Sequence, residues 1–359
     1  MTRQPSVLVA MSGGVDSSVA ASVLHERGYR VLGSHLNLVH LDGVEHGCCG
    51  PQARADAEAV ARVGGFDFEV VDMSETFERT VVRDFVDEHR AGRTPNPCVR
   101  CNERIKFAAF LERADALGFD FVATGHYART WPDRRGRWHL GRGLDRNKDQ
   151  SYVLHTLGQR QLARTLFPVG EQEKSETRAH AARLGLPVAG KPDSQEVCFV
   201  PGADHAGFLE TLAPDLVRAG GIVDAATGAV VGEHRGAHRY TIGQRRGLGS
   251  PTGERRYVVD VDAATNRVMV GPADLLARRG LVADRMHWVA GRPPRRRFRA
   301  DVRIRYRGED AAAMVRATSG GRAVIEFASP QRAVAPGQSA VLYAGDEVLG
   351  GGRIAEAIR

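Results

Sequence analysis

The sequence predicts an α/β protein, in which a doubly wound parallel sheet is followed by a small β-rich central domain and a C-terminal β-barrel. Three observations support this prediction. Strand-like and helix-like segments alternate over the first 204 residues, short β-like runs broken by glycines follow, and a Gly271-Pro272 break divides those runs into two groups. The predicted domains are residues 1–204, 205–275 and 276–359.

The elements of the first domain alternate regularly from the N-terminus. Short apolar runs predict strands, and apolar residues spaced by three and four predict helices. Alternation of this kind predicts parallel strands with helices on both faces. The loops after Met11, Leu38 and Thr124 should then converge at the carboxyl ends of the strands, where such sheets bind ligands. Strands are expected at 6–11, 31–38, 67–73 and 119–124, and helices at 15–27, 51–63 and 102–117.

The other two domains consist of short runs with frequent turn residues, which is typical of small barrels. Central strands are expected within 220–232 and at 238–242, 257–261 and 267–270. Barrel strands are expected at 302–306, 314–317, 323–327 and 340–343.

Composition excludes several classes of protein. The 359 residues are 42% hydrophobic and 26% charged, which is ordinary globular usage and argues against a disordered or fibrous chain. No 18-residue stretch lacks charge, and the first residues do not resemble a signal peptide. We therefore expect a cytoplasmic protein with no membrane partner.

Positive charge is concentrated in the C-terminal part. Residues 1–204 carry 26 Lys and Arg against 27 Asp and Glu, whereas residues 205–359 carry 24 against 16. This distribution predicts a polyanionic partner that docks mainly on the C-terminal portion. A solvated basic surface is the alternative that charge alone leaves open.

A glycine-rich loop follows the first predicted strand and leads into a helix. Its residues, Ser12-Gly13-Gly14-Val15-Asp16-Ser17-Ser18, offer a tight turn, hydroxyl donors and the N–H groups of a helix start, which together favour a bound phosphate. The alternative is a serine-capped turn. The loop lacks the Walker pattern and has no lysine beside it in the sequence. Because Asp16 would repel a phosphate, we expect Mg²⁺ to bridge the two.

The Ser-Gly-Gly-x-Asp-Ser pattern resembles that of the pyrophosphatase-loop (PP-loop) family of ATP-dependent enzymes. The resemblance implies a fold similar to the adenine nucleotide alpha hydrolases. Members activate a carbonyl oxygen as its adenylate and release pyrophosphate.

The cysteines suggest reactive chemistry. Cys98 and Cys101 lie just before the predicted helix at 102–117, whose N-terminus and cations would lower a thiol pKa and make Cys101 a plausible nucleophile. Half of a zinc site is the alternative, but no second Cys-x2-Cys pair is present. Cys198 taken alone would be a small buried residue. Cys48 and Cys49 have no clear role, and we interpret them as incidental loop thiols.

Five ordered motifs resemble those of the tRNA-specific 2-thiouridylase family, over nearly the whole chain. They are Ser12 to Ser18, Gly125-His126-Tyr127-Ala128-Arg129, Lys148-Asp149-Gln150-Ser151-Tyr152, Asp193 to Phe199, and Thr241 to Gly249. The resemblance implies ATP-dependent thiolation of the wobble uridine, position 34, of tRNA. The tRNAs would be those for Lys, Glu and Gln, and a cysteine desulfurase or a sulfur-relay protein would supply the sulfur.

The resemblance also implies residue roles. Cys101 matches the nucleophile and Cys198 the persulfide carrier, and the two would form a catalytic disulfide. ATP would contact Ala10, Met11, Ser12, Gly13, Gly14, Val15, Asp16, Ser17, Leu36 and Gly125. tRNA would contact Asn96, Pro97, Cys98, His126, Lys148, Asp149, Gln150, Arg305, Tyr306 and Gln338.

One residue departs from the family pattern. Cys98 stands where the motif commonly has aspartate, so Cys98, Cys101 and Cys198 could instead ligate a [4Fe–4S] cluster that carries a sulfide. Further aromatic and cationic residues would help to hold an unstacked base, while the arginine-rich run at 292–299 suits either a phosphate contact or a solvated linker. These further residues are Tyr152, Arg245 and Arg246.

Two other functions stay open at this point. One is a different adenylating enzyme, such as an amide synthetase, which would need no paired distant cysteines. The other is a non-catalytic RNA-binding module, against which the intact phosphate loop argues.

Overall fold

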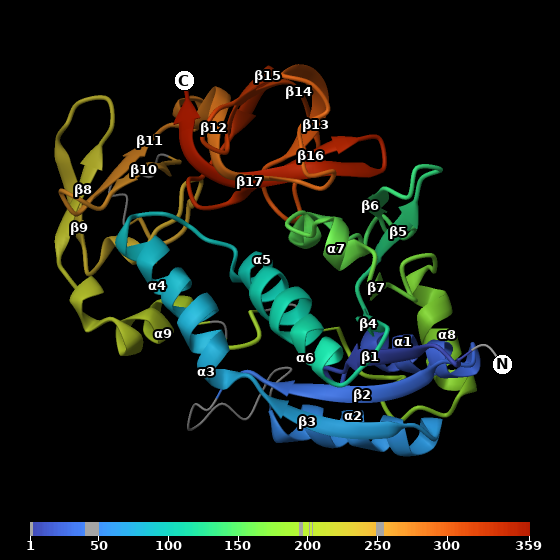
Figure 1. Ribbon diagram of the computed structural model, residues 1–359. Helices are drawn as coiled ribbons and strands as arrows, with labels where there is room; N and C mark the ends of the chain where they lie inside the picture. The colour runs from blue at the N-terminus through green and yellow to red at the C-terminus, as the bar shows by residue number, and fades with distance from the viewer. Residues whose placement is uncertain (1–2, 40–49, 194–196, 201, 203, 249–254) are drawn as a thin grey trace.

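The structure, a computed structural model, describes residues 3–39, 50–193, 197–200, 202, 204–248 and 255–359. In this part of the chain it contains a five-stranded parallel sheet, a four-stranded sheet and a closed six-stranded barrel. Figure 1 shows the parallel sheet at the bottom, the barrel at the top and the small sheet at the upper left. The predicted fold class is therefore confirmed.

The parallel sheet has the strand order β3-β2-β1-β4-β7. Its strands are β1 (Ser6–Ala10), β2 (Arg30–Asn37), β3 (Asp67–Asp72), β4 (Phe121–Ala123) and β7 (Thr165–Leu166). The direction of winding reverses between β1 and β4, which makes the carboxyl edge at these two strands the switch point where such sheets bind ligands. The loops after both strands carry predicted nucleotide-binding residues.

Alternating side chains of β1 explain why both faces of this sheet are covered. Val7 and Val9 point into one apolar cluster, and Leu8 points into another on the opposite face. The first cluster is covered by α1 (Val15–Glu26), α2 (Pro51–Gly64) and α8 (Lys174–Arg183). The second, which we call the large cluster, is covered by α4 (Arg83–Arg90), α5 (Pro97–Cys101) and α6 (Phe110–Ala116).

The helix that carries the first cysteine pair begins earlier than predicted. A π-helical segment, Asn102–Ala109, joins α5 to α6, so residues 97–116 form one continuous helix rather than the expected 102–117. Pro97 occupies the first turn, and the Asn96 side chain caps it by accepting from the Cys98 N–H at 3.1 Å. The sequence did not predict a second helical segment, which runs through α3 (Ser74–Phe77), a π-helical stretch at Glu78–Val82 and α4.

The small sheet has the order β10-β11-β8-β9. Its strands are β8 (Gly220–Asp224), β9 (Val230–His234), β10 (Tyr257–Asp262) and β11 (Arg267–Gly271). The Asp224 carboxylate caps the β8–β9 turn by accepting from the N–H groups of Ala226 and Thr227, so the 220–232 run is a hairpin. The strand predicted at 238–242 is wrong: the chain forms a short 3-10 turn at Ala237–Arg239, and the Tyr240 ring packs beside His234.

The barrel closes because β12 pairs with both β15 and β17. Its strands are β12 (Ala277–Trp288), β13 (Arg297–Arg303), β14 (Ala311–Thr318), β15 (Arg322–Arg332), β16 (Ser339–Ala344) and β17 (Glu347–Ile358). The strand predicted at 302–306 is displaced, because β13 ends at Arg303 and a loop follows. A hairpin of β5 (Ala128–Pro132) and β6 (Trp138–Arg142) lies outside the barrel. It joins the barrel sheet where Gly141 of β6 pairs with Glu347 of β17.

Short helices complete the described chain. They are α7 (Gln159–Leu162), α9 (His205–Leu212), and 3-10 turns at Ser151–Leu154, Pro214–Leu216 and Ala273–Leu276. Among the described residues, none of the helices combines the length and apolar character that crossing a bilayer requires.

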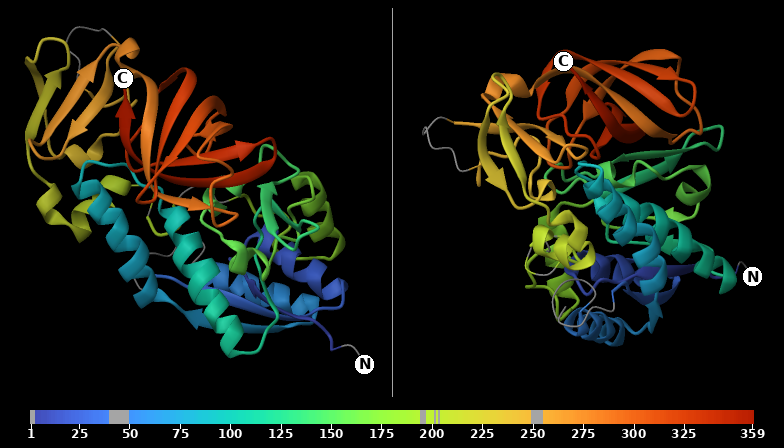
Figure 2. Two further views of the ribbon diagram at one scale, coloured as in Figure 1. Left: turned by 45° about the horizontal axis from the view of Figure 1, so that its top comes forward. Right: turned by 90° about the vertical axis from the view of Figure 1, so that its left-hand side faces the viewer.

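A buried carboxylate joins the α4 region to the barrel, which lie side by side in both views of Figure 2. The Glu88 side chain is only 4% exposed and accepts from Arg93 and from Arg353 of β17, each at 2.5 Å. Arg353 also pairs with Asp284 of β12 at 2.6 Å. Burial opposes ionisation of Glu88, but the two arginines outweigh it and lower its pKa. The ion pair therefore needs both regions in place.

Replacing this carboxylate should destabilise the protein. We expect Glu88→Ala to lower the free energy of unfolding by about 3 kcal/mol, because it removes the buried carboxylate that two partly buried guanidinium groups share and leaves Arg353 with Asp284 alone. Urea denaturation measures this loss. The stabilisation is full above the ordinary carboxyl pKa of 4.5 and is lost as acid protonates the folded-state carboxylate.

The exposed pair of Glu75 and Arg79 provides the control. Glu75→Ala should change stability by less than about 0.5 kcal/mol. Equal losses for the two variants would contradict a structural role for Glu88.

Candidate active site

The loop between β1 and α1 is curled over the start of the helix. The Ser17 hydroxyl donates to the Gly14 carbonyl at 3.1 Å and accepts from the Ser12 N–H at 3.2 Å. Gly13 has φ +68°, and a side chain there would lie 2.1 Å from the Ala53 carbonyl oxygen of α2. Glycine is thus required, and the first-turn N–H groups of α1 can serve an anion.

The loop after β4 touches this helix start. A Cβ atom on Gly125 would lie 2.4 Å from the Ser17 backbone nitrogen, so no other residue fits without moving the backbone. Met11 and Leu36 are buried at the ends of β1 and β2. The structure therefore gathers the residues predicted to bind ATP at one edge of the sheet.

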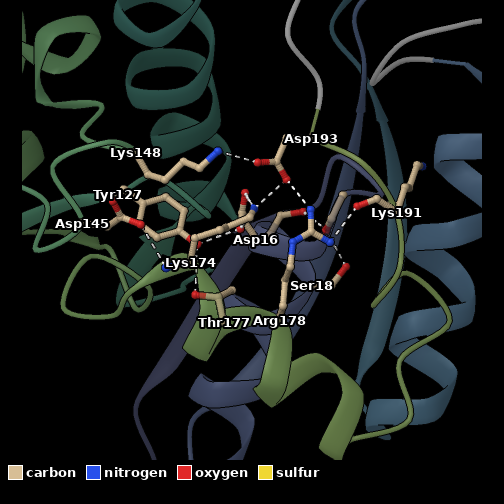
Figure 3. A network of polar contacts seen from close by, with 12 residues as sticks. Asp16, Ser18, Tyr127, Asp145, Lys148, Lys174, Thr177, Arg178, Lys191 and Asp193 are labelled. Atoms are coloured by element: carbon tan, nitrogen blue, oxygen red, sulfur yellow. Dashed lines mark hydrogen bonds and ion pairs between the residues drawn. The ribbon is translucent and has the colours of Figure 1, made fainter.

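A charge network flanks the loop (Figure 3). Asp16 accepts from Lys174 at 2.6 and 2.8 Å and from the Tyr127 hydroxyl at 3.0 Å. Lys191 donates to the Gly13 carbonyl at 2.9 Å and to Asp56 at 2.6 Å. The loop thus has lysines beside it in space, although none is near it in the sequence.

These contacts change the case for a metal ion. Lys174 compensates the charge of Asp16, so Asp16 alone no longer requires Mg²⁺. Burial and Asp16 raise the pKa of Tyr127, which keeps its hydroxyl protonated as a donor. Mg²⁺ usually binds through few protein ligands together with substrate phosphates, so Asp16 and the phosphates of ATP would be its ligands.

Asp193, in the fourth sequence motif, is held by three cations. Lys148 donates to it at 2.8 Å, Lys174 lies 2.9 Å away, and Arg178 donates at 2.8 Å. Burial opposes ionisation of Asp193, but the hydrogen bonds from the lysines outweigh it and lower its pKa to about 2. Sequence reasoning missed Lys174, Arg178 and Lys191. The one signal for the two lysines was the rarity of that residue, which occurs four times in the chain, and Arg178 had none.

The two cysteines assigned to catalysis reach the same apolar region. Cys101 is buried in the large cluster, and Cys198 is partly buried and packs against it. Ala10 of β1 and Tyr306, which follows β13, pack against it as well. One cluster therefore adjoins the nucleotide loop, both thiols and the barrel. Cys98 is exposed in the first turn of α5, and Cys48 and Cys49 lie outside the described residues.

Of the two cations expected to activate Cys101, Arg104 and Lys106, the first pairs with Glu103 at 3.3 Å. Glu103 also pairs at 2.6 Å with Arg100, the residue before Cys101. The helix dipole acts most strongly within the first helical turn, and Cys101 lies beyond that turn.

The thiols do not fit an iron–sulfur cluster as they are placed. No group of three or more His, Cys, Asp or Glu side chains in the described part of the chain is arranged to hold a metal ion. Cys98, Cys101 and Cys198 are all described residues, so we derive no step through a cluster.

The barrel braces the segment that precedes the cysteines. The Thr94 N–H donates to the Pro336 carbonyl at 2.9 Å, and the Gln338 side-chain amide donates to the Thr94 carbonyl at 2.8 Å. Gly337, at φ +95°, lies so close that a Cβ atom would be 2.8 Å from the Thr94 nitrogen. Gln338, predicted to contact tRNA, thus holds this segment in place.

Three other residues predicted to contact tRNA, Pro97, His126 and Asp149, are buried. His126 accepts or donates a hydrogen bond with Thr124 at 2.6 Å, and burial, aided by Lys106, lowers its pKa well below the usual range. Asp149 is buried and accepts from the Ser151 hydroxyl at 3.0 Å. The His126 and Asp149 side chains therefore lie inside the protein rather than at its surface.

The remaining predicted contacts lie nearer the surface. Arg305 is exposed in the loop after β13. Its neighbour Tyr306 is half-buried, with its ring 6.0 Å from the Tyr152 ring. Gln150 accepts from the Tyr127 N–H at 2.9 Å. Arg245 and Arg246 are exposed. Tyr152 is the exception among these residues, because it is fully buried and donates to the Ser339 carbonyl at 2.9 Å.

Family models match almost the whole chain. Residues 5–202 match the "tRNA methyl transferase HUP domain", 207–272 the "tRNA methyl transferase PRC-barrel domain" and 278–354 the "Aminomethyltransferase beta-barrel domain". Among solved structures, an NMN synthetase from Francisella tularensis is 15% identical to this chain, with a TM-score of 0.32. The match covers 54% of this chain and 67% of the synthetase chain. That likeness is too weak to carry an argument.

Curated relatives are much closer. The chain is 48% identical over 355 residues to a "tRNA-specific 2-thiouridylase MnmA" from Chloroflexus aggregans, with 98% of each chain covered. It is 47% identical over 352 residues to the protein of the same name from Moorella thermoacetica, with 97% and 98% covered. These matches confirm the family predicted from the motifs: the chain belongs to the tRNA-specific 2-thiouridylase family.

Proposed function

We propose that this protein transfers sulfur to the C2 position of uridine 34 in tRNA and converts ATP to AMP and pyrophosphate. The observation that supports the proposal is that Cys101 is buried in the large cluster, while Cys198 and Ala10, at the end of β1, pack against the same cluster. The names of the relatives support it. The word "methyl transferase" in the family description fits the site less well, because the Ser12–Ser18 loop is typical of adenylating enzymes, and the amide-synthetase alternative is not favoured by the relatives.

The first step activates the uridine. Its C2 oxygen attacks the α-phosphorus of ATP, and the P–O bond to the β-phosphate breaks, which releases pyrophosphate. The helix N-terminus and the Ser12 and Ser17 hydroxyls would bind the phosphates. Mg²⁺, if held by Asp16 and the phosphates, would supply additional charge neutralisation.

The second step moves sulfur. The terminal sulfur of a Cys198 persulfide attacks C2, and AMP leaves with the former carbonyl oxygen. The Cys101 thiolate then attacks the Cys198 sulfur, the S–S bond to the transferred sulfur breaks, and the electron pair stays on the thiocarbonyl sulfur. A Cys101–Cys198 disulfide results, and two external thiol groups must supply two electrons to reopen it, becoming a disulfide themselves.

Partners and boundaries follow from the same proposal. The substrates would be tRNAs for Lys, Glu and Gln in the cytoplasm, and the sulfur would come from a cysteine desulfurase or a relay protein. The exposed Arg305 and the basic C-terminal part support a tRNA surface there. We also propose domain boundaries at 204/205 and 275/276.

The direct test is thionucleoside formation. Full-length protein, unmodified tRNA, ATP, Mg²⁺ and a persulfide donor should give tRNA retarded on a mercury gel, with one pyrophosphate released per thiolated uridine. Absence of retardation with every donor, sulfide included, would contradict the proposal.

Arg305 gives a separate test of the tRNA surface. Arg305→Ala should weaken tRNA binding and reduce the slope of log K against log salt by about 1, because one phosphate contact is lost. Filter binding across a salt series measures this slope. Arg27→Ala, at the opposite end of α1 from the phosphate loop, is the matched control. An unchanged slope for Arg305→Ala would remove the role assigned to it.

A further inference from the structure

The three cations around Asp193 are placed to bind a phosphate group. Lys148 comes from the loop after β6, while Lys174 and Arg178 lie one turn apart on α8. Their nitrogens reach one carboxylate from three directions, as Figure 3 shows. A carboxylate with three charge-assisted hydrogen bonds occupies the kind of environment that a phosphate oxygen also prefers.

This cationic group is continuous with the phosphate loop. Lys174 bridges the two, because its amino group contacts both Asp16 of the loop and Asp193. Three cations, Lys148, Lys174 and Arg178, form ion pairs with Asp16 and Asp193, and the carboxylate of Asp145 accepts from the Lys174 backbone N–H at 3.1 Å. An anion in the loop would therefore lie next to ammonium and guanidinium donors that Asp193 shares.

The choice of lysine supports a phosphate role. The chain carries 50 Lys and Arg in total, of which four are lysines, and three of these four belong to this network. An ammonium group is a compact point charge with three donors, whereas a guanidinium is a planar fork that suits paired contacts. Lys174, which must reach two carboxylates at once, uses this compactness.

We propose that Lys148, Lys174 and Arg178 form a subsite for the pyrophosphoryl part of ATP and for the pyrophosphate product, and that the Asp193 carboxylate competes with phosphate for these cations. The proposal rests on the ATP-dependent function above. Competition of this kind weakens phosphate binding. Asp193 thereby favours release of pyrophosphate once the α-phosphate bond has broken.

The test is the affinity for inorganic pyrophosphate, measured by calorimetry on the full-length protein. Asp193→Asn removes the competing charge and should tighten pyrophosphate binding by about two- to fivefold, whereas Lys148→Met should weaken it by a similar factor. Lys148 is the safest cation to replace, because it is the most exposed of the three. In the double variant the gain from Asp193→Asn should shrink, because one of the contested cations is gone.

Asp115→Asn is the matched control. Asp115 also accepts from two cations, Arg160 and Arg164, but lies on the far end of α6. Its replacement should leave pyrophosphate affinity unchanged.

Unchanged or weaker pyrophosphate binding by Asp193→Asn would overturn the proposal. The thiolation assay on the same wild-type preparation tests the proposed function separately. A wild type that thiolates tRNA, combined with an insensitive Asp193→Asn variant, removes the subsite and leaves the function standing. A wild type that does not thiolate removes the function, while the pyrophosphate affinities still decide the subsite.

Discussion

Replacing Cys198 or Cys101 with serine is expected to lower tRNA thiolation by at least about a thousandfold, the scale on which loss of a nucleophile acts. A serine hydroxyl at residue 198 cannot carry a persulfide, and a serine at residue 101 cannot break the S–S bond. Adenylation should persist in both variants, since neither side chain belongs to the phosphate loop. Mercury-gel retardation measures the loss, and tRNA-dependent release of pyrophosphate measures what remains.

Cys98→Ser is the matched control for these variants. Cys98 is one helical turn from Cys101 but is exposed on the surface, so the two-thiol route predicts that its variant remains active. Loss of activity in all three variants would mean that Cys98 is needed as well, and iron and sulfide assays on anaerobically purified protein would then separate a cluster ligand from the predicted tRNA contact. Thiolation by Cys198→Ser would contradict the persulfide role.

Gly125→Ala is expected to weaken ATP binding by roughly a hundredfold, because displacements of about 1 Å at a reacting site have effects of this size. The added Cβ would lie 2.4 Å from the Ser17 nitrogen and 2.6 Å from the Asp16 carbonyl carbon. Both are backbone atoms of the phosphate loop, so the loop must shift. Calorimetric titration with ATP measures the change.

Gly190→Ala is the control, since nothing lies within 4 Å of a Cβ atom at that position. It should bind ATP as the wild type does. Normal ATP binding by Gly125→Ala would show that the phosphates lie elsewhere.

The parallel sheet was predictable because its signals are local. The strand predicted at 6–11 is β1, and the helix predicted at 15–27 is α1, each within one residue at its ends. Short buried runs and an amphipathic pattern determine such elements without help from distant residues. The strands β12 and β17 were missed, since both shift register along their length and β17 contains Gly350, Gly351 and Gly352, which hide the alternation.

The sequence predicted the part of the site that lies within a single motif. The Ser12–Ser18 loop could be recognised from its glycines and serines, whereas the ion pairs of Lys174 and Lys191 depend on chain segments that meet only in three dimensions. The bracing role of Gln338 was hidden for the same reason, because its partner is Thr94 of another domain. The roles of Cys101 and Cys198 stay predictions.

The bracing of Thr94 by residues 336–338 also sets an order of assembly during translation. The two partners are 244 residues apart, so at about 5–20 residues per second the ribosome needs roughly 12–50 s between them. The nascent parallel sheet can close its phosphate loop within that time, whereas the cysteine segment must wait for the last barrel strands. A chain released before Pro336 therefore carries the nucleotide loop without a braced cysteine segment, and sulfur chemistry is the last capability that synthesis completes.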